Sequence, residues 1–442
     1  MNIKKVTGNG ALAALSRTGA QPEPALPRHI VDRNTEIFGE VLSAEAVVKR
    51  IIADVRDNGD DAIRKYTRLY DGREPGDLEV PREEWEGALS RIDPELRSAL
   101  ELAADRIRGF HEKQKSESWF DAGDLGIFGQ IIRPLERVGV YTPGGSAALP
   151  SSLLMTAIPA RVAGVAEIVV AAPPRGEEGI PDVILAAAVI AGVDRVFAIG
   201  GAQAIAALAH GTQSVPQVDK ICGPGNIFVA LAKQQVSGTV AIDQVAGPTE
   251  TLVIADDSAD LELVAADMIA QAEHDPLASA ILVTTSTRIA DDIVGELEKQ
   301  ASELPREDII RRSLQANGVI TLVDSLETAM ECANAYAPEH MCLLVGDPWS
   351  LVPRVRNAGG IFVGEHSPEA LGDYTAGPSH VMPTSGTARF SSPTNVLDFQ
   401  KIISLAAGNR NAIEALGDAT VRIARAEGLD GHAASVIRRQ KS

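Results

Sequence analysis

The run Arg195-Val196-Phe197-Ala198-Ile199-Gly200-Gly201-Ala202-Gln203 decides the fold class, because a β-rich segment passes through two glycines directly into a helical pattern. The same succession recurs between about residues 131 and 256. The other strand candidates there are Val138 to Tyr141, Glu167 to Ala172 and Thr251 to Ala255, and the helix candidates are Ser151 to Ala163, Pro181 to Ala191 and Gln203 to Ala209. Strands that alternate with helices are typical of βαβ units. The sequence therefore predicts an α/β fold with a mainly parallel sheet.

The flanking chain extends this architecture. A second alternating series predicts another α/β domain, with strands near 279–285, 318–323, 340–345 and 360–363. Upstream, charged helical segments are predicted over Ala44 to Asp57, Asp60 to Tyr70, Glu83 to Ile92 and Pro94 to Gln114. Such helices commonly cover a sheet or contact another subunit.

The first 30 residues show little periodicity. Gln21 to Pro27 is rich in proline and predicts an extended arm. Gly8 to Ala13 has a glycine spacing similar to that of a dinucleotide site. Because no strand is predicted before it, we expect a helix start there and not nucleotide binding.

The composition favours a small-molecule partner. The 442 residues are 45% hydrophobic and 23% charged, which is ordinary for a globular protein of two or three domains. The formal net charge of −19 disfavours nucleic acid and anionic membranes. Three cysteines without CxxC spacing, Cys222, Cys332 and Cys342, are expected to be reduced and buried. No signal-like or membrane-length apolar run occurs, so we expect a cytoplasmic protein.

Three glycine-rich turns follow predicted strands, over Thr142 to Ser146, Gly200 to Gln203 and Gly223 to Asn226. Glycine lets backbone amides approach a phosphate at the positive end of a helix. None of the turns is a full G-x-G-x-x-G, so each alone could be structural. Their clustering after strands, where ligands of open α/β sheets bind, favours a nucleotide site.

Gln271-Ala272-Glu273-His274-Asp275-Pro276 closes a predicted helix whose start cap is expected at Ser258. Gln271 and His274 are three residues apart, so they could share one helix face and chelate an ion. Alternatively, the histidine only complements the helix dipole, since glutamine is a poor metal ligand.

Glu339 and His340 follow Tyr336-Ala337-Pro338 between a predicted helix over 326–335 and a strand. Proline disfavours helix before it, so both residues are expected on the connecting turn. The pair could divide proton transfer and water activation between them, or it could be an exposed turn. Asp373 could likewise be a turn former, and His432 could lie on a frayed end.

Taken together, these segments closely resemble the histidinol dehydrogenase family, in family order over about residues 40 to 435. The matching stretches are Val138 to Gly145, Gly200 to Ala204, Gly223 to Asn226, Ala246 to Glu250, Gln271 to Pro276, Tyr336 to His340, Gly372 to Pro383 and Glu427 to His432. Ser379 stands where asparagine is common in the family.

The resemblance implies roles for individual residues. The implied zinc ligands are Gln271, His274, Asp373 and His432, in the N/O chemistry that zinc accepts. The implied catalytic pair is Glu339 and His340, and the implied NAD contacts are Tyr141, Gln203 and Asn226. The implied substrate contacts are Thr249, His380 and Glu427, together with Gln271, His274, His340, Asp373 and His432.

The resemblance also implies a fold and an assembly. The family has two incomplete Rossmann-like domains with parallel sheets and small terminal segments, in an intertwined homodimer whose C-terminal segment completes the partner's site. Residues 141–248 would form the NAD-binding domain, and 37–140 with 249–393 the domain with the metal and catalytic residues. Residues 1–36 would be an N-terminal arm, and 394–442 the dimerisation segment.

The implied activity is the zinc-dependent, four-electron oxidation of L-histidinol to L-histidine through histidinal, with two NAD, at the end of histidine biosynthesis. The alternative is a paralogous zinc and NAD dehydrogenase of another polar alcohol, such as a sulfonated diol. A zinc hydrolase could also use a Glu/His pair, but it needs no nucleotide turns. A binding protein without catalysis would leave the combination of metal, base and nucleotide turns unexplained.

Overall fold

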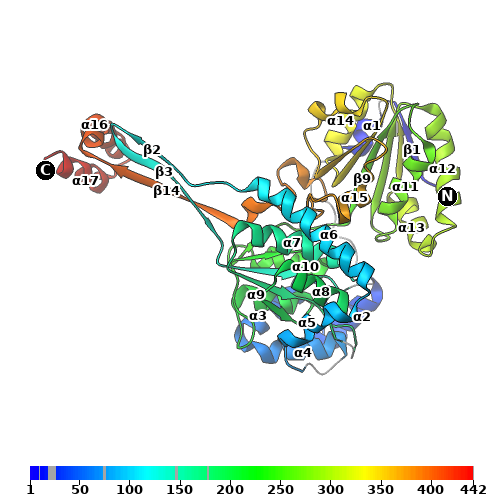
Figure 1. The fold of residues 1–442 in the computed structure, drawn as a ribbon, viewed down its shortest axis with the longest axis horizontal. Helices are drawn as coiled ribbons and strands as arrows, with labels where there is room; N and C mark the ends of the chain where they lie inside the picture. Colours follow the sequence, from blue (N-terminus) through cyan, green and yellow to red (C-terminus); the bar gives the residue numbers. More distant parts are fainter. Residues whose placement is uncertain (9, 18–25, 73–75, 145–147, 177–178, 442) are drawn as a thin grey trace.

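The computed structural model describes residues 1–8, 10–17, 26–72, 76–144, 148–176 and 179–441, and it forms two α/β domains and a long arm (Figure 1). Of the predicted features, Gln21 to Ala25 of the proline-rich segment and Gly145 and Ser146 of the first glycine turn lie outside these ranges. Among the described residues, no helix combines the length and apolar character needed to cross a membrane.

The first domain has a six-stranded sheet, parallel throughout, in the order β1-β11-β10-β9-β12-β13. Its strands are β1 (Lys4–Thr7), β9 (Glu250–Ala255), β10 (Ser279–Thr284), β11 (Val319–Leu322), β12 (His340–Leu344) and β13 (Gly360–Val363). Its helices are α1 (Gly10–Leu15), α11 (Leu261–Ala272), α12 (Thr287–Ala301), α13 (Glu307–Asn317), α14 (Leu326–Tyr336) and α15 (Glu369–Tyr374). Along β9, Val253 packs with α11, α12 and α13, whereas its neighbour Leu252 packs with α1 and α14. Helices therefore cover both faces, which explains why every residue of β9 is buried.

The second domain has a five-stranded parallel sheet in the order β6-β5-β4-β7-β8. Its strands are β4 (Arg137–Tyr141), β5 (Glu167–Ala171), β6 (Arg195–Phe197), β7 (Lys220–Cys222) and β8 (Ala241–Ile242). One face is covered by α5 (Arg82–Arg91), α6 (Pro94–His111), α7 (Pro150–Ala163) and α8 (Asp182–Ala191). The other is covered by α3 (Ala44–Asn58), α4 (Asp60–Asp71), α9 (Gly201–His210) and α10 (Ile227–Val236), with α2 (Arg28–Phe38) at its edge. Alanine-rich α8 and α9 let helix and sheet approach closely.

The arm extends away from both domains and carries the C-terminal helices at its tip (Figure 1). It is an antiparallel sheet of β2 (Trp119–Gly123), β3 (Gly126–Pro134) and β14 (Gln400–Gly408), followed by α16 (Arg410–Ala426) and α17 (Asp430–Gln440). Short 3₁₀ turns lie at Glu112–Gln114, Pro348–Ser350, Val352–Arg354, Thr387–Arg389 and Val396–Phe399.

The α/β class and the parallel sheets are confirmed, and so is the burial of all three unpaired cysteines. Two local expectations were wrong. Strand β1 does precede Gly8, and it was missed because its ladder partner β11 is remote in sequence. The cap of α11 is Asp260, since Ser258 instead donates to Asp256 Oδ1. For the arm, the resemblance implied only a C-terminal segment over 394–442, and the antiparallel pairing of β14 with β3 and β2 was not predicted.

The packing also differs from the expected domain boundaries. Residues 44–111 pack mainly on the sheet of residues 137–242, although α6 also contacts the 376–381 loop, where Arg106 Nη2 donates to Ala376 O and Val381 joins the same core. The N-terminal segment is no separate arm, because β1 joins the edge of the six-stranded sheet. The apolar faces of α3 to α6 are buried by the nearer sheet, which is what fixes this grouping.

Candidate active site

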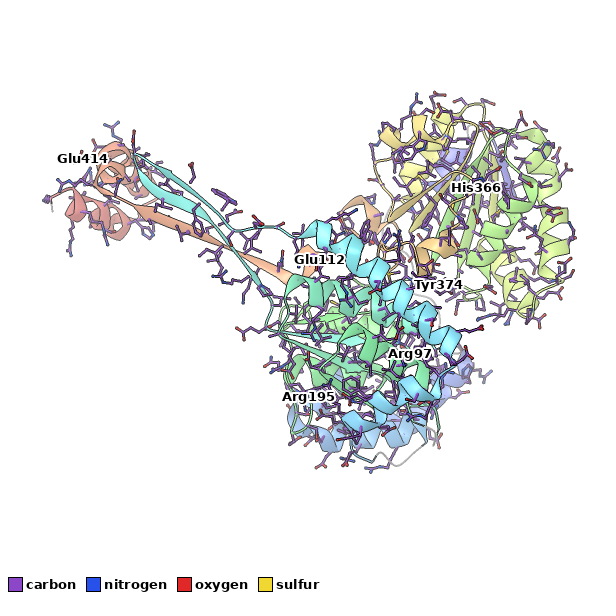
Figure 2. The ribbon with its side chains drawn as sticks, viewed as in Figure 1. Arg97, Glu112, Arg195, His366, Tyr374 and Glu414 are labelled. Carbon is purple, nitrogen blue, oxygen red and sulfur yellow. The ribbon has the colours of Figure 1, made fainter. Side chains whose placement is uncertain are left out.

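A cavity of about 180 Å³ lies where the two α/β domains meet. The first domain lines it with Thr249, His274, Glu339, His340, Asp373, Tyr374 and His380, and the second with Leu149, Ser151, Ser152 and Pro224. Figure 2 shows Tyr374 at this boundary between the domains. The cavity thus gathers the predicted catalytic pair with several predicted ligands.

The predicted catalytic pair lies at the amino end of β12, an inner strand of the six-stranded sheet. Helix α14 ends where Ala337 adopts a left-handed φ of 53°, and Pro338 follows. Glu339 lies on the turn as expected, whereas His340 is already the first residue of β12. Both side chains are buried.

The backbone of one neighbouring residue, Glu250, contacts both of these side chains. The carboxylate Oε2 of Glu339 accepts hydrogen bonds from Thr249 Oγ1 at 2.5 Å and from Glu250 N at 3.0 Å. His340 Nδ1 lies 3.1 Å from Glu250 O, and its Nε2 lies 3.4 Å from Asp373 Oδ1. Because a carbonyl oxygen can only accept, Nδ1 carries a proton and Nε2 is the nitrogen that can exchange one.

Burial and charge shift the pKa values of this pair. Burial raises the pKa of Glu339 to about 7. Burial alone would lower the pKa of His340, but the carboxylates of Glu339, Asp373 and Glu369 raise it to about 10. Two groups with strongly shifted pKa values in one cavity are typical of an acid–base site.

Gln271 and His274 lie at the end of α11, next to the cavity. Gln271 is fully buried on the last turn, whereas His274 lies beyond the helix end at Ala272. The Gln271 amide is oriented so that both its nitrogen and its oxygen form hydrogen bonds. The nitrogen donates to Glu369 Oε1 at 3.1 Å, and the oxygen accepts from Glu250 N at 2.7 Å. Burial lowers the pKa of His274, which favours the neutral imidazole that metals bind.

His380 and Ser379 join the loop after α15 to the second domain. His380 Nδ1 lies 2.8 Å from Asp373 O, and its Nε2 lies 3.1 Å from Ser152 Oγ. Ser379 Oγ donates to Met155 O at 3.2 Å, so serine is satisfied at this buried position. The loop therefore fixes Asp373 against α7.

Glu369 was missed by the sequence reasoning. It is buried beside Gln271, burial raises its pKa to about 8, and its Oε2 has no hydrogen-bond partner. Its spacing of four residues from Asp373 on α15 was a usable signal, because such residues share a helix face.

A second cavity of about 360 Å³ lies at the carboxyl edge of the five-stranded sheet. It is lined by Tyr141, Gln203 and Asn226, and by glycines of two predicted turns, Gly144 and Gly200. Tyr141 Oη accepts from Gly201 N at 3.1 Å, and Asn226 caps α10. The structure thus brings together the three residues implied as NAD contacts.

A buried ion pair holds the third glycine turn, which separates the two cavities. Lys233 Nζ pairs with Asp243 and donates to Gly223 O at 2.9 Å, while Gly223 N donates to Asp243 Oδ2 at 2.7 Å. A Cβ at Gly223 would lie 2.1 Å from Tyr141 O, so only glycine fits this close approach.

The two C-terminal site residues lie elsewhere. Glu427 ends α16 and His432 is exposed on α17, at the tip of the arm. Figure 2 shows Glu414 of α16 far from Tyr374 at the cavity. Within one chain the structure does not bring Glu427 or His432 to the other predicted ligands.

The described residues of one chain do not form a metal site by themselves. They contain no group of three or more His, Cys, Asp or Glu side chains placed to hold an ion. His274 and Asp373 line one cavity, and Gln271 adds an amide beside it. These N and O donors suit zinc, which takes three or four such ligands, so the set fits once another ligand is added.

The chain is similar to known proteins over nearly its whole length. The sequence profile of the histidinol dehydrogenase family matches residues 38–440. Histidinol dehydrogenase of Deinococcus radiodurans is 52% identical over 441 residues, which cover 99% of this chain and 100% of that protein. That of Geobacter metallireducens is 50% identical over 416 residues, 93% of this chain and 94% of that protein. The crystal structure of histidinol dehydrogenase from Elizabethkingia anophelis has a TM-score of 0.91 at 32% identity, covering 99% of this chain and 98% of that one.

Proposed function

The chain belongs to the histidinol dehydrogenase family, and we propose on this basis that it oxidises L-histidinol to L-histidine through histidinal, with reduction of two NAD. The observation that carries the proposal is the placement of Glu339 and His340 in one cavity with His274 and Asp373. The alternative of a paralogous dehydrogenase for a sulfonated diol is not favoured by relatives at about 50% identity along the chain.

Zinc is the proposed metal, held by Gln271, His274 and Asp373 of one chain and by His432 of a second. When bound, it would orient the polar groups of the substrate and stabilise developing negative charge. His340 can accept a proton only when neutral, and a cation at Asp373 would offset the negative charge that raises the histidine pKa.

NAD is the proposed redox partner, in the cavity lined by Tyr141, Gln203 and Asn226. The amino ends of α9 and α10 lie at this cavity, and backbone amides there suit a pyrophosphate. Pro224 lines the catalytic cavity and Asn226 lines this one, so NAD held here would be separated from the substrate only by the turn that these residues form.

His340 is the proposed base in both oxidations. Its Nε2 would take the alcohol proton in the first oxidation, for which bound NAD would supply the hydride acceptor, and histidinal is the product. Once Nε2 has released that proton to solvent and water has added to the aldehyde, the same nitrogen would take a proton from the gem-diol in the second oxidation. The Nδ1 hydrogen bond to Glu250 O keeps the imidazole in the required orientation.

Glu339 is the proposed activator of the water. In its ionised form the carboxylate accepts a proton from water as the oxygen attacks the aldehyde carbon. Burial raises the pKa of Glu339 to about 7. A pKa close to neutral pH suits a group that both takes and returns a proton.

A homodimer would complete the site. The arm of one chain would place Glu427 and His432 at the cavity of its partner, where Glu427 would contact the substrate with Thr249 and His380. Thr249 and His380 both line that cavity. The buried, unpaired cysteines are compatible with the cytoplasm, where we place the enzyme.

The test is the yield of NADH per substrate consumed. We expect two equivalents from histidinol and one from histidinal, and loss of both after treatment with a chelator and recovery with zinc. The Glu339→Gln variant should release close to one equivalent from histidinol, because only the aldehyde step needs activated water. A yield of one in the unmodified enzyme, or no reaction with histidinol, would contradict the proposed function.

A further inference from the structure

Arg17 connects the N-terminal segment to the base of the catalytic turn. Its guanidinium makes a two-pronged ion pair with Glu250, from Nη1 to Oε2 at 2.8 Å and from Nη2 to Oε1 at 2.6 Å. It also lies 3.7 Å from the centre of the Tyr336 ring, at the end of α14. Arg17 precedes the region that the family profile matches, residues 38–440.

Glu250 is the residue whose backbone holds the catalytic pair. Its N–H donates to Glu339 and its carbonyl accepts from His340, at 3.0 and 3.1 Å. Its side chain is 5% exposed and, besides Arg17, accepts from Ser385 N at 3.2 Å. A shift of the Glu250 backbone would therefore displace both reacting side chains together, because its N–H contacts one of them and its carbonyl contacts the other.

We infer that Arg17 is a positioning residue, which fixes Glu250 and through it the orientation of Glu339 and His340 in both hydride transfers. The inference rests on the proposed function for its kinetic consequences. Arg17 touches neither substrate nor cofactor cavity, since it lines neither of the two.

The Arg17–Glu250 ion pair is better suited to orienting the Glu250 carboxylate than to stabilising the fold. A buried ion pair adds little net stability, because desolvation of both charges offsets their attraction. The planar guanidinium instead sets both distance and angle of a carboxylate, and Tyr336 restrains the plane of the guanidinium. Misplacement of reacting groups by about 1 Å can cost about 100-fold in rate.

The experiment compares Arg17→Lys, Arg17→Met and the double variant Arg17→Met/Glu250→Gln with Lys5→Met. Lys5 is the matched control, because it anchors the same N-terminal segment through Ala290 O at 2.8 Å without contacting Glu250. The double variant removes the unpaired buried charge, so it keeps the test valid if Arg17→Met fails to fold.

We expect kcat to fall about 10- to 100-fold in the Arg17→Met variants, with KM for NAD and zinc content unchanged. Arg17→Lys should lie between them and the unmodified enzyme, and added guanidinium should partly restore Arg17→Met. Lys5→Met should have unaltered kcat. A double variant with the kcat of the Lys5→Met control would overturn the inference.

A second readout needs no activity. The protein is labelled with ¹⁵N-histidine, and the Nδ1–H resonance of His340 is assigned by its loss in the His340→Gln variant. This resonance should shift in both Arg17→Met variants and should not shift in Lys5→Met. An unshifted resonance would refute the positioning role. If the unmodified protein does not oxidise histidinol, the proposed function fails, and this resonance still decides the role of Arg17.

Discussion

The two α/β domains and the arm differ in how far they bury their apolar side chains. In the domains, helices cover both faces of each sheet. In the arm, Trp119 and Phe120 are 50% and 56% exposed, and Ile402 and Ile403 are 61% and 46% exposed. Neighbouring strand residues point to opposite faces, so both faces of the arm sheet are apolar and uncovered. The domains therefore bury their apolar side chains within one chain, whereas the apolar side chains of the arm need a surface of another molecule to cover them.

The same difference divides the candidate site. The first domain holds Gln271, His274 and Asp373 near Glu339 and His340, and the arm holds Glu427 and His432. Such a division is what an exchanged segment in a two-fold dimer would require. The following predictions test the difference between domains and arm.

The largest effect should come from separating the two halves of the site. His340→Asn and His432→Asn should each lower kcat by about 100-fold or more, because one loses the base and the other a ligand. Mixed chains should recover about a quarter of full activity, since half of the dimers are mixed and each has one intact site. NADH formation after joint refolding measures this.

His366→Gln on the first domain and Glu414→Gln on the arm are the controls, because both residues are exposed and lie away from the cavity (Figure 2). Both should keep full activity. A mixed sample as inactive as its parents would contradict the completion of one chain's site by the arm of the other.

Next, Lys233→Met should destabilise the second domain. It leaves Asp243 buried without its cation, which costs about 3–5 kcal/mol of unfolding free energy. It should also raise KM for NAD, since Lys233 fixes Gly223. Urea unfolding measures the first effect. Lys299→Met, which breaks an exposed pair with Glu296, should leave stability unchanged, and equal effects of the two variants would refute the argument.

A smaller effect is expected for the apolar faces of the arm. Ile402→Ser and Ile403→Ser remove apolar side chains from opposite faces, and each should weaken dimerisation about 10- to 100-fold. Analytical ultracentrifugation over a concentration series gives the dissociation constants. Trp349→Ser removes a side chain that is 71% exposed on the first domain and should change nothing. Unchanged dimerisation in both isoleucine variants would mean that the arm is not the interface.

The smallest effect concerns the joint between α6 and the arm. His111 is buried there with Nδ1 donating to Ile107 O at 2.8 Å, and burial lowers its pKa. The unfolded chain therefore binds a proton at higher pH than the folded chain. Stability should fall as pH drops below the ordinary histidine value of about 6.5. The His111→Gln variant should show a smaller decrease of melting temperature between pH 7 and 5. An unchanged slope of melting temperature against pH would exclude His111 as the cause.

The sequence by itself determined the repeated α/β units, and it was enough to predict a set of site residues. Predicted helices such as Ala44 to Asp57 agree closely with α3 (Ala44–Asn58), because helical periodicity and caps are local properties. The glycine turns likewise identified the second cavity, since strand ends and following helices are adjacent in the chain.

Only the tertiary structure decided which parts meet. The arm depends on pairs such as Ile402 with Ile132, and strand β1 depends on β11, and no local pattern encodes such distant partners. The structure also placed Glu339 and His340 at the amino end of β12, between two domains, where they contact the backbone of Glu250, whose side chain Arg17 holds. Burial and charge at that junction set the pKa values of the pair, and they exist only once remote segments are packed together.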